Sequence, residues 1–508
     1  MNRWCRLLAL ACVFPARASG QDSTAVLSQG VPVSLSLDEA LRQARAHSPT
    51  YRQALNNAAP ARWGVRNAYG SLLPSVTAST DVGYTGSGQS SLGGGLTFST
   101  SPFLTSGYSL GLEWQLSGRA LMAPAQQKAL QRATDEDISG AGVTLTSEIS
   151  TQYLNTLQAS AQVQVARQQV KRNEDFLALA RARHQVGQAT LLDVRQAEVT
   201  KAGSDVALLR AVQAENEAKL DLLRRMGVEP PVAIEQIVLS DSFPVSAPTV
   251  KLDSLLALAE QHNPLLRSLR AREHAADLDV RAAKSDFLPS LSFRAGWSGF
   301  TQQYTNEGLL LQQTLTDAQG KAADCQFDNS VKSALSLGGQ VPNCYASNGL
   351  VDGGSALLDP VSQQIRNQND VFPFRYTGQP FGANLSLSLP IFTGFSRSLR
   401  LSQARAQQED ADEDIRARRL AVRSDVQARY LALHTAYQAI AVQASSRDAA
   451  RDQLRLAQER YRVGAGSALE LSDAQNSVQK AEGDYITAVY DYHKAVAALE
   501  AAVGGPLR

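Results

Sequence analysis

Two carboxylates near the C-terminal end of the chain, Glu470 and Asp473, are the side chains best placed to do chemistry. They are three positions apart, so that on a helix both lie on one face. Neighbouring carboxylates repel one another, and attraction of cations is the chemistry for which such groups are suited. Glu470 also stands three positions after Ser467, the spacing of a helix capping box. Asp473 has no capping role, and a solvated surface charge is its alternative.

The remaining polar residues predict neither catalysis nor a metal site. The six histidines show no metal-binding spacing, and no Gly-rich phosphate loop precedes a helix. His47 precedes Ser-Pro and His262 precedes Asn-Pro, each at a predicted helix start, where a structural role is expected. We therefore predict that the protein is not an enzyme and has no cofactor or metal. The histidines are His47, His184, His262, His274, His434 and His493.

The first eighteen residues have the features of a secretory signal peptide. Arg3 and Arg6 precede an apolar run over residues 7–14, and small residues surround Arg17. Lipidation of Cys12 is the less favoured alternative, because the residues before it match a lipoprotein signal poorly. We predict an exported chain that begins near residue 19.

Export leaves Cys325 and Cys344 as the only cysteines, and we expect an oxidising compartment to join them in a disulfide. Without residues 1–18 the chain has 46 basic and 48 acidic residues, so no basic field predicts binding to nucleic acid. Beyond the leader, no stretch approaches the roughly 20 apolar residues of a membrane-spanning helix. If the chain spans a membrane, it does so with strands.

The elements that position these residues come from an internal duplication. Pro49 and Pro264 lie in similar segments whose residue numbers differ by 215. Gly187 and Gly464 lie in similar segments whose residue numbers differ by 277. The second copy is therefore longer than the first, by the difference between these two offsets, which is 62. We expect this insertion to be a loop over the segment 300–378, which is rich in Gly, Ser and Asn and holds Cys325 and Cys344.

Strict alternation of apolar and polar residues predicts strands in the middle of each copy. We expect a hairpin at 75–117 and strands near 290–299 and 380–392. Their length of about ten residues fits transmembrane barrel strands, and ordinary soluble hairpins are the alternative. Four strands cannot close a barrel, and an open edge in lipid leaves backbone groups unpaired. The membrane interpretation therefore requires several chains.

Long helices are predicted from Arg119 to Val186 and from Phe395 to Val463. Each would be about 100 Å long, which no compact domain can hold. Their narrow, Ala-rich apolar stripes suit close-packed helices with water on two sides, as in a hollow tube. A generic long coiled coil is the alternative.

Each long helix ends at a short hairpin, whose turn contains Gly187 in the first copy and Gly464 in the second. Thr190 with Asp193, and Ser467 with Glu470, then predict capping boxes at the start of the returning helices.

These motifs together resemble the TolC family of outer-membrane factors over nearly the whole mature chain. The resemblance is carried by the duplicated segments through Pro49 and Pro264, the paired tips ending at Gly187 and Gly464, and the strand exit at residues 389–394, LPIFTG. It implies a mainly α fold with a transmembrane β-barrel portion. Three chains would supply four strands each to a twelve-stranded barrel that continues into a long periplasmic α-helical barrel.

The resemblance also implies a function and partners. The protein would be a homotrimer in the Gram-negative outer membrane, in contact with its lipid and extending into the periplasm. It would serve as the exit duct of a tripartite efflux or type I secretion system. A periplasmic adaptor, or membrane fusion protein, would join it to an inner-membrane pump of the RND or ABC type. The alternative is a secreted or periplasmic coiled-coil scaffold or adhesin-like protein.

Site residues follow from the same resemblance. Asp193 and Tyr461 match residues that hold neighbouring helices together when the periplasmic end is closed, while Glu470 and Asp473 match the acidic ring at the constriction. In a trimer this ring would hold six carboxylates. Gly466 replaces a basic partner of the closed state, so the closing network must differ here. The positions that match adaptor contacts are Arg183, Val186, Gly187, Arg460, Val463 and Gly464.

The exit motif departs from the family pattern, with Thr393 and Phe395 where an acid and a glycine are usual. The predicted organisation is a signal peptide at 1–18, an extension at 19–36, a first repeat at 37–228, a linker at 229–250 and a second repeat at 251–505.

Overall fold

A computed structural model describes residues 33–92, 96–230, 232–335 and 338–507. The predicted signal peptide lies outside these residues. Helices account for most of the described chain, which divides into two compact units. Within the described residues, no helix is both long and apolar enough to cross a membrane.

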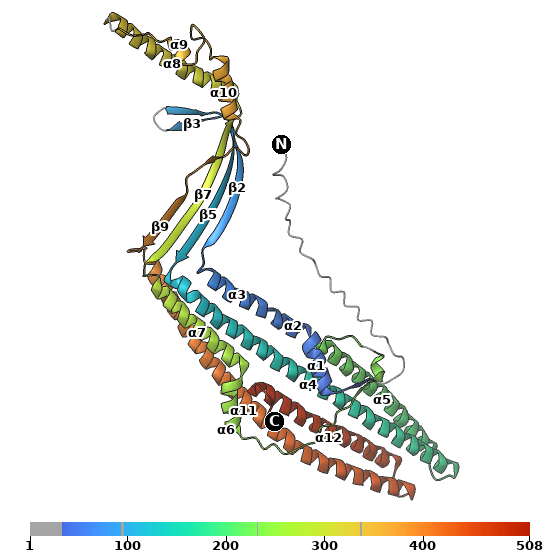
Figure 1. The fold of residues 1–508 in the computed structure, drawn as a ribbon. Coiled ribbons are helices and arrows are strands. Elements are labelled where there is room, and N and C mark those ends of the chain that lie inside the picture. The colour runs from blue at the N-terminus through green and yellow to red at the C-terminus, as the bar shows by residue number, and fades with distance from the viewer. Residues whose placement is uncertain (1–32, 93–95, 231, 336–337, 508) are drawn as a thin grey trace. The chain divides into compact units, whose positions relative to one another are not determined.

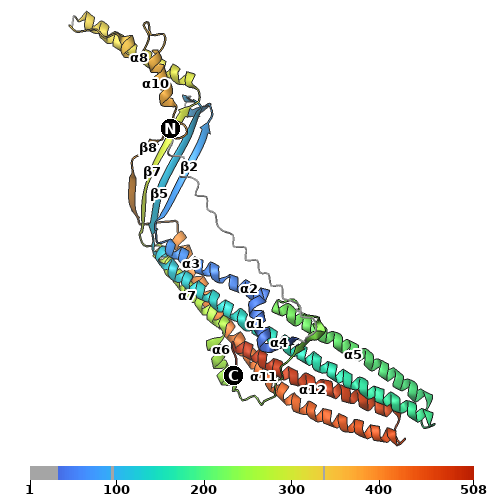
Figure 2. The same cartoon turned by 45° about the vertical axis from the view of Figure 1, so that its right-hand side comes forward.

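The first unit is helical and is formed by residues 33–58, 134–269 and 415–507 of the described chain. The helices α4 and α5 form one antiparallel hairpin, and α11 and α12 form a second beside it, with both turns at the same end (Figures 1 and 2). A parallel pair of short strands, β1 and β6, accompanies them. The elements that lie in this unit wholly or in part are β1 Val33–Leu35, α1 Leu37–His47, α2 Pro49–Asn56, α4 Gly118–Gln185, α5 Leu191–Met226, η1 Ile234–Gln236, β6 Ile237–Leu239, α6 Leu252–His262, α7 Pro264–Ser285, α11 Ser396–Arg462 and α12 Ala468–Val503.

Helices α4 and α11 have 68 and 67 residues. Both begin in the second unit and continue into the first. Pro124 lies within the first two turns of α4 and removes one backbone donor there without ending the helix.

The duplication is repeated in the packing of the first unit. One core cluster contains Ala44 of α1 with Ile149 of α4 and Leu222 of α5. The equivalent residues of the second copy, Ala259, Val426 and Leu499, form the centre of another cluster. Both sets keep the two repeat offsets found in the sequence, so the two copies bury the same helix faces.

In each copy, a glycine ends the last helix and lies close to the junction of two preceding helices. Gly227, at φ 76°, ends α5 so close to the junction of α1 and α2 that an added Cβ would lie 2.5 Å from the carbonyl oxygen of His47. Gly504, at φ 95°, ends α12 against the second junction, with 3.0 Å to the carbonyl oxygen of His262. Both positions need glycine, for the left-handed backbone and for the close approach.

The second unit, Ala59–Ala133 and Arg270–Asp414, contains an antiparallel sheet. The strand order is β2, β5, β7, and then β8 and β9, which pair successively with the same edge of β7. β3 and β4 form a separate hairpin. The elements are α3 Ala58–Gly70, β2 Ser75–Thr85, β3 Gly88–Leu92, β4 Leu96–Thr100, β5 Phe103–Leu116, β7 Ser290–Tyr304, β8 Thr377–Gly378 and β9 Gly382–Ser388.

The strand register sorts the side chains of this sheet into one apolar and one polar face. Trp114, Phe293 and Leu385 stand in one row across β5, β7 and β9 on the apolar face. The adjacent row on the other face holds Glu113 and Arg294, whose side chains form an ion pair of 2.8 Å. Strands of period two produce this segregation directly.

The segment 300–378 contains three helices in addition to strand residues, where sequence analysis placed a loop. These are α8 Glu307–Ala334, α9 Cys344–Ser347 and α10 Asp359–Asn369. A small core packs Ala318 and Ala322 of α8 against Leu350. A disulfide joins Cys325 to Cys344 and so ties α8 to α9. Leu315, Ala318 and Ala322 keep helical spacing and were the signal for α8, which the Gly, Ser and Asn of the whole segment obscured.

The chain returns from this insertion to the sheet through side-chain amides. The buried Asn369 accepts from the backbone N–H of Tyr304 and donates to its carbonyl oxygen, both at 2.8 Å. Gln303 Oε1 accepts from the N–H of Phe372 at 2.9 Å. The Asn369 amide occupies the backbone hydrogen-bonding position at the end of β7 that a further strand would otherwise fill.

Candidate functional site

The turns of the two helical hairpins hold most of the predicted site residues. α4 ends at Gln185, and Gly187 adopts φ 74° before Thr190 caps α5. Thr190 Oγ1 accepts from the N–H of Asp193 at 3.2 Å, and the N–H of Thr190 donates to Asp193 Oδ2 at 2.8 Å. The predicted first capping box is confirmed.

The second turn differs in its acidic residue. Gly464 adopts φ 81°, and Ser467 Oγ accepts from the N–H of Glu470 at 3.1 Å. The carboxylate of Glu470 pairs with Arg460 at 3.4 Å instead of returning to the backbone of Ser467. The predicted box is therefore only half formed, because a nearby guanidinium competes with a backbone N–H for the carboxylate.

Arg183 links the two hairpins. Its guanidinium lies 4.7 Å from the ring centroid of Tyr461 and donates to the carbonyl oxygen of that residue. It also donates to the carbonyl oxygen of Gln188 at 3.1 Å. One side chain of the first hairpin thus holds the end of α11, so that Arg183 has contacts within the chain in addition to its predicted place at the tip.

Tyr461 is buried among the helices at this end, with its ring 5.5 Å from that of Phe176. Burial raises the pKa of its hydroxyl, Arg183 opposes the rise and the carboxylate of Asp193 adds to it. The structure therefore brings Asp193, Tyr461 and Arg183 together, as a neutral phenol between a carboxylate and a guanidinium.

Asp473 lies apart from this group. It is exposed on α12, and among the described residues its carboxylate has no hydrogen-bond or ion-pair partner. Glu470, about 40% exposed, is neutralised locally by Arg460. Of the two acids, Asp473 is the one that carries an uncompensated charge.

Two exposed leucines at the tips were missed by sequence reasoning, beside the two valines that it had placed there. Val186 and Val463 are 69% and 72% exposed, as their tip positions imply. Leu192 and Leu469, at the start of the returning helices, are also 74% and 57% exposed. The two leucines are related by the same repeat offset as the two valines, so this offset was the signal that could have found them.

A buried ion network was also missed. Glu482 of α12, 8% exposed, accepts from Arg451 of α11 at 2.9 Å and from Arg172 of α4 at 3.4 Å. Gln169 Oε1 also accepts from the Arg172 guanidinium, at 2.8 Å. Burial lowers the pKa of Arg172, against the opposing effect of Glu482. Three helices of the two hairpins therefore meet at one carboxylate.

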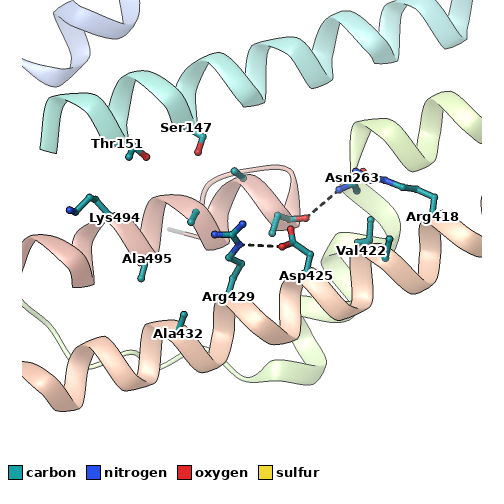
Figure 3. Close-up of a pocket in the computed structure, with 14 residues that line it drawn as sticks. Ser147, Thr151, Asn263, Arg418, Val422, Asp425, Arg429, Ala432, Lys494 and Ala495 are labelled. Carbon is teal, nitrogen blue, oxygen red and sulfur yellow. Dashed lines mark hydrogen bonds and ion pairs between the residues drawn. The ribbon is translucent and has the colours of Figure 1, made fainter. Parts of the chain in front are cut away.

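A polar groove of about 670 Å³ lies between α4, α11 and α12 (Figure 3). Asp425 pairs there with Arg429 at 3.2 Å, and Asn263 donates to the carbonyl oxygen of Ala502 at 3.2 Å. Its lining residues contain no histidine or cysteine and no nucleophile paired with a base. Within the described part of the chain, no group of three His, Cys, Asp or Glu residues could hold a metal ion.

The model of the outer membrane efflux protein family matches residues 40–228 and 361–505, about two thirds of the chain. The chain belongs to this family. Its members are outer-membrane proteins, and the protein is accordingly placed in the outer membrane of a Gram-negative cell. The unmatched stretch between the two parts includes α8 and α9 of the insertion.

Two curated relatives come from Pseudomonas putida: the probable efflux pump outer membrane protein SepC and the toluene efflux pump outer membrane protein TtgF. Each is 28% identical over 190 residues. This aligned part is 37% of the chain and only 38% of each relative.

Solved structures match over nearly the whole length. The chain is similar to CusC, with a TM-score of 0.66, 16% identity and 93% of both chains covered. It is equally similar to the outer membrane protein VceC of Vibrio cholerae, with a TM-score of 0.65, 15% identity, and 93% of this chain and 97% of that one covered. The fold is thus that of the TolC-like outer-membrane channels, and the family and fold are those of channel proteins rather than enzymes.

Proposed function

We propose that the protein is the outer-membrane exit duct of a tripartite efflux or type I secretion system. Three copies would close a twelve-stranded barrel in the membrane and continue it as a helical tunnel in the periplasm. Substrates would pass through passively, driven by a separate pump.

The two-faced sheet carries this proposal. Within the described part of the chain, its outer strands β2 and β9 each lack a partner on one side. Apolar side chains on these strands are largely exposed, among them Val82 at 68% and Leu387 at 71%. β8 and β9 together fill one edge of β7, so the sheet has the width of four strands. An apolar face of this width with two open edges is stable in lipid only when further copies supply the missing strands. The opposite, polar face would line the channel.

Extraction and channel recording test the proposal. We expect the protein to require detergent for release from membranes, to migrate as a trimer and to produce single-channel currents in a planar bilayer. Recovery as a monomer in the soluble periplasmic fraction would refute it and favour the scaffold or adhesin-like alternative.

The tips suit docking by a periplasmic adaptor. Each tip presents an exposed valine beside a left-handed glycine and an exposed leucine, a small apolar surface that a partner protein could cover. We place Val186, Gly187, Val463 and Gly464 at this contact, with Arg183 and Arg460 behind them. An RND or ABC pump in the inner membrane would be coupled through the adaptor.

We place the gate at the periplasmic end and predict that Asp473→Ala weakens the block of single-channel current by divalent cations. Asp473 has no partner for its carboxylate among the described residues, so in a trimer three such charges would attract cations at the axis. Glu470→Ala is the matched control and should have a smaller effect, because Arg460 already pairs with Glu470. Unchanged block in Asp473→Ala would remove this residue from the gate.

The link between the hairpins gives a second gate prediction. We expect Arg183→Ala to increase single-channel conductance, because the guanidinium that holds α11 to the first hairpin is lost. Tyr461→Phe keeps the ring under the guanidinium and should change conductance little. No increase in Arg183→Ala would remove the guanidinium from the gate, and an equal increase in both variants would show that the phenol hydroxyl is needed as well.

A further inference from the structure

The polar groove between α4, α11 and α12 contains an arginine without a partner. Arg418 of α11 lines the groove, and its Nε is buried there. Among the described residues, no group accepts a hydrogen bond from this Nε and no carboxylate pairs with the guanidinium. A buried donor that is left unpaired destabilises a fold, and more so when it is charged. Arg418 therefore offers a positive charge and a donor to any group that enters the groove.

The other charged side chains that line the groove are paired within the chain. The guanidinium of Arg429 donates to Asp425 at 3.2 Å. The ammonium of Lys494 pairs with Asp491 at 2.8 Å. Of the described charges in the groove, Arg418 is thus the one that is not compensated. A ligand with one negative charge would balance it, whereas a second negative charge would find no unpaired cation.

Alanines form the floor of the groove. Arg418 lies at one end and Lys494 at the other, and Ser147 and Thr151 supply a wall without charge from α4 (Figure 3). Apart from Lys494, the residues that α12 contributes are Ala495, Ala498, Ala501 and Ala502. A floor without polar side chains suits a short hydrocarbon chain, and the volume of about 670 Å³ is within the range of small-molecule sites.

The first repeat shows that the fold does not need this open floor. By the repeat offset, α5 carries charged residues where α12 has alanines of the floor. They are Asp221, Arg224 and Arg225, which correspond to Ala498, Ala501 and Ala502. Asp221 accepts from both arginines, so α5 covers this face with paired charges. Ala141 takes the position of Arg418. The second repeat alone thus combines a bare floor with an unpaired cation.

We propose that this groove binds a monocarboxylate with a short apolar chain. The carboxylate would accept from the guanidinium of Arg418, whose planar donors match its two oxygens. The hydrocarbon chain would lie along the alanines of α12. All these groups belong to one copy of the protein, so the site does not depend on a second copy. It goes beyond the proposed function, which concerns passage and not binding.

Binding of octanoate to the purified full-length chain tests the proposal. The chain is held in an amphipol, so that no detergent micelle takes up the probe, and binding is measured by titration calorimetry. We expect one octanoate per chain, and an affinity lower by about tenfold in Arg418→Gln, because a charge-assisted hydrogen bond becomes a neutral one. Arg419→Gln is the matched control. It removes an exposed arginine of α11 that does not line the groove, and should bind octanoate as the native chain does.

A second variant, Ala498→Asp, tests the floor. It places in the groove the residue that the first repeat has at this position, and should abolish binding, because it fills the floor and repels the carboxylate. Thermal unfolding followed by circular dichroism checks the fold. Arg418→Gln should unfold no earlier than the native chain, since Arg418 has no partner to lose. Octanoate should raise the midpoint of the native chain but not of Arg418→Gln.

Four results would overturn the site. Equal affinity of the native chain and Arg418→Gln for octanoate would show that the guanidinium takes no part. Equal binding of octan-1-ol would show partition into an apolar surface, and tighter binding of inorganic phosphate would show a site for small anions without a chain. A lower unfolding midpoint of Arg418→Gln would show that this arginine is held by the fold and is not available to a carboxylate.

Discussion

Replacing Gly227 by alanine should destabilise the protein by about 3 kcal/mol, because the change combines a left-handed backbone with overpacking. The added Cβ would lie 2.5 Å from the carbonyl oxygen of His47, a backbone atom that cannot turn away as the end of a flexible side chain can. The junction of α1, α2 and α5 would have to open. We expect a clear fall in the thermal unfolding midpoint, followed by circular dichroism in detergent, and a lower yield of assembled protein.

Two other glycines are matched controls for this prediction. Gly187→Ala has the same left-handed backbone, at φ 74°, but no atom within 4 Å of the added Cβ, so we expect a loss of about 1 kcal/mol from strain alone. Gly203 lies in the interior of α5 with open space around it, and alanine there should stabilise the helix by roughly 0.5 kcal/mol. If all three variants lost the same stability, close approach would not be the cause.

Replacing Glu482 by alanine should have the other large effect, a loss of roughly 3 kcal/mol, because it leaves a buried guanidinium without its charge partner. Arg172 is 19% exposed, and burial already lowers its pKa, so it depends on Glu482 for compensation. We expect a lower thermal unfolding midpoint and a weaker association of the two hairpins, measured as faster protease cleavage near the tips.

Variants of the partners separate charge from hydrogen bonding. Arg451→Ala should cost much less than Glu482→Ala, since Arg451 is 52% exposed and water can replace it. Glu482→Gln keeps an acceptor but removes the charge, and should fall between the two. A Glu482→Gln variant as stable as the native protein would mean that hydrogen bonds alone hold this network.

Much of the fold was predictable from periodicity and from the two offsets. The alternation at 75–117 and the long helical patterns were informative because side-chain direction repeats every two residues in a strand and every 3.6 residues in a helix. The paired positions of Gly227 and Gly504 follow from the repeat itself. The three helices of the insertion were not predicted, because the Gly, Ser and Asn of the segment obscured the helical spacing of α8. The contacts with Leu350 and the disulfide that hold α8 are not visible in local spacing.

The candidate site was less predictable because its contacts join distant parts of the chain. Arg183 and Tyr461 are 278 residues apart, and Glu482 meets Arg172 across 310 residues. Spacing along the sequence indicates which residues share one helix face, but not which face of the other hairpin they meet. The capping of Asp193 was local and was predicted, whereas the turn of Glu470 toward Arg460 depended on a competing charge.

The amide pairing of Asn369 with Tyr304 has a practical consequence for this protein. The Asn369 side chain bonds the backbone of Tyr304 at the end of β7, so the chain is fixed to the sheet again at this point. We expect this fixed point to be independent of the length of the segment before it. Residues 307–368 thus behave as a cassette, bounded by a strand at one end and a fixed amide at the other. Foreign epitopes or shorter linkers could be exchanged there, and natural variation could accumulate there, without a shift in a single strand.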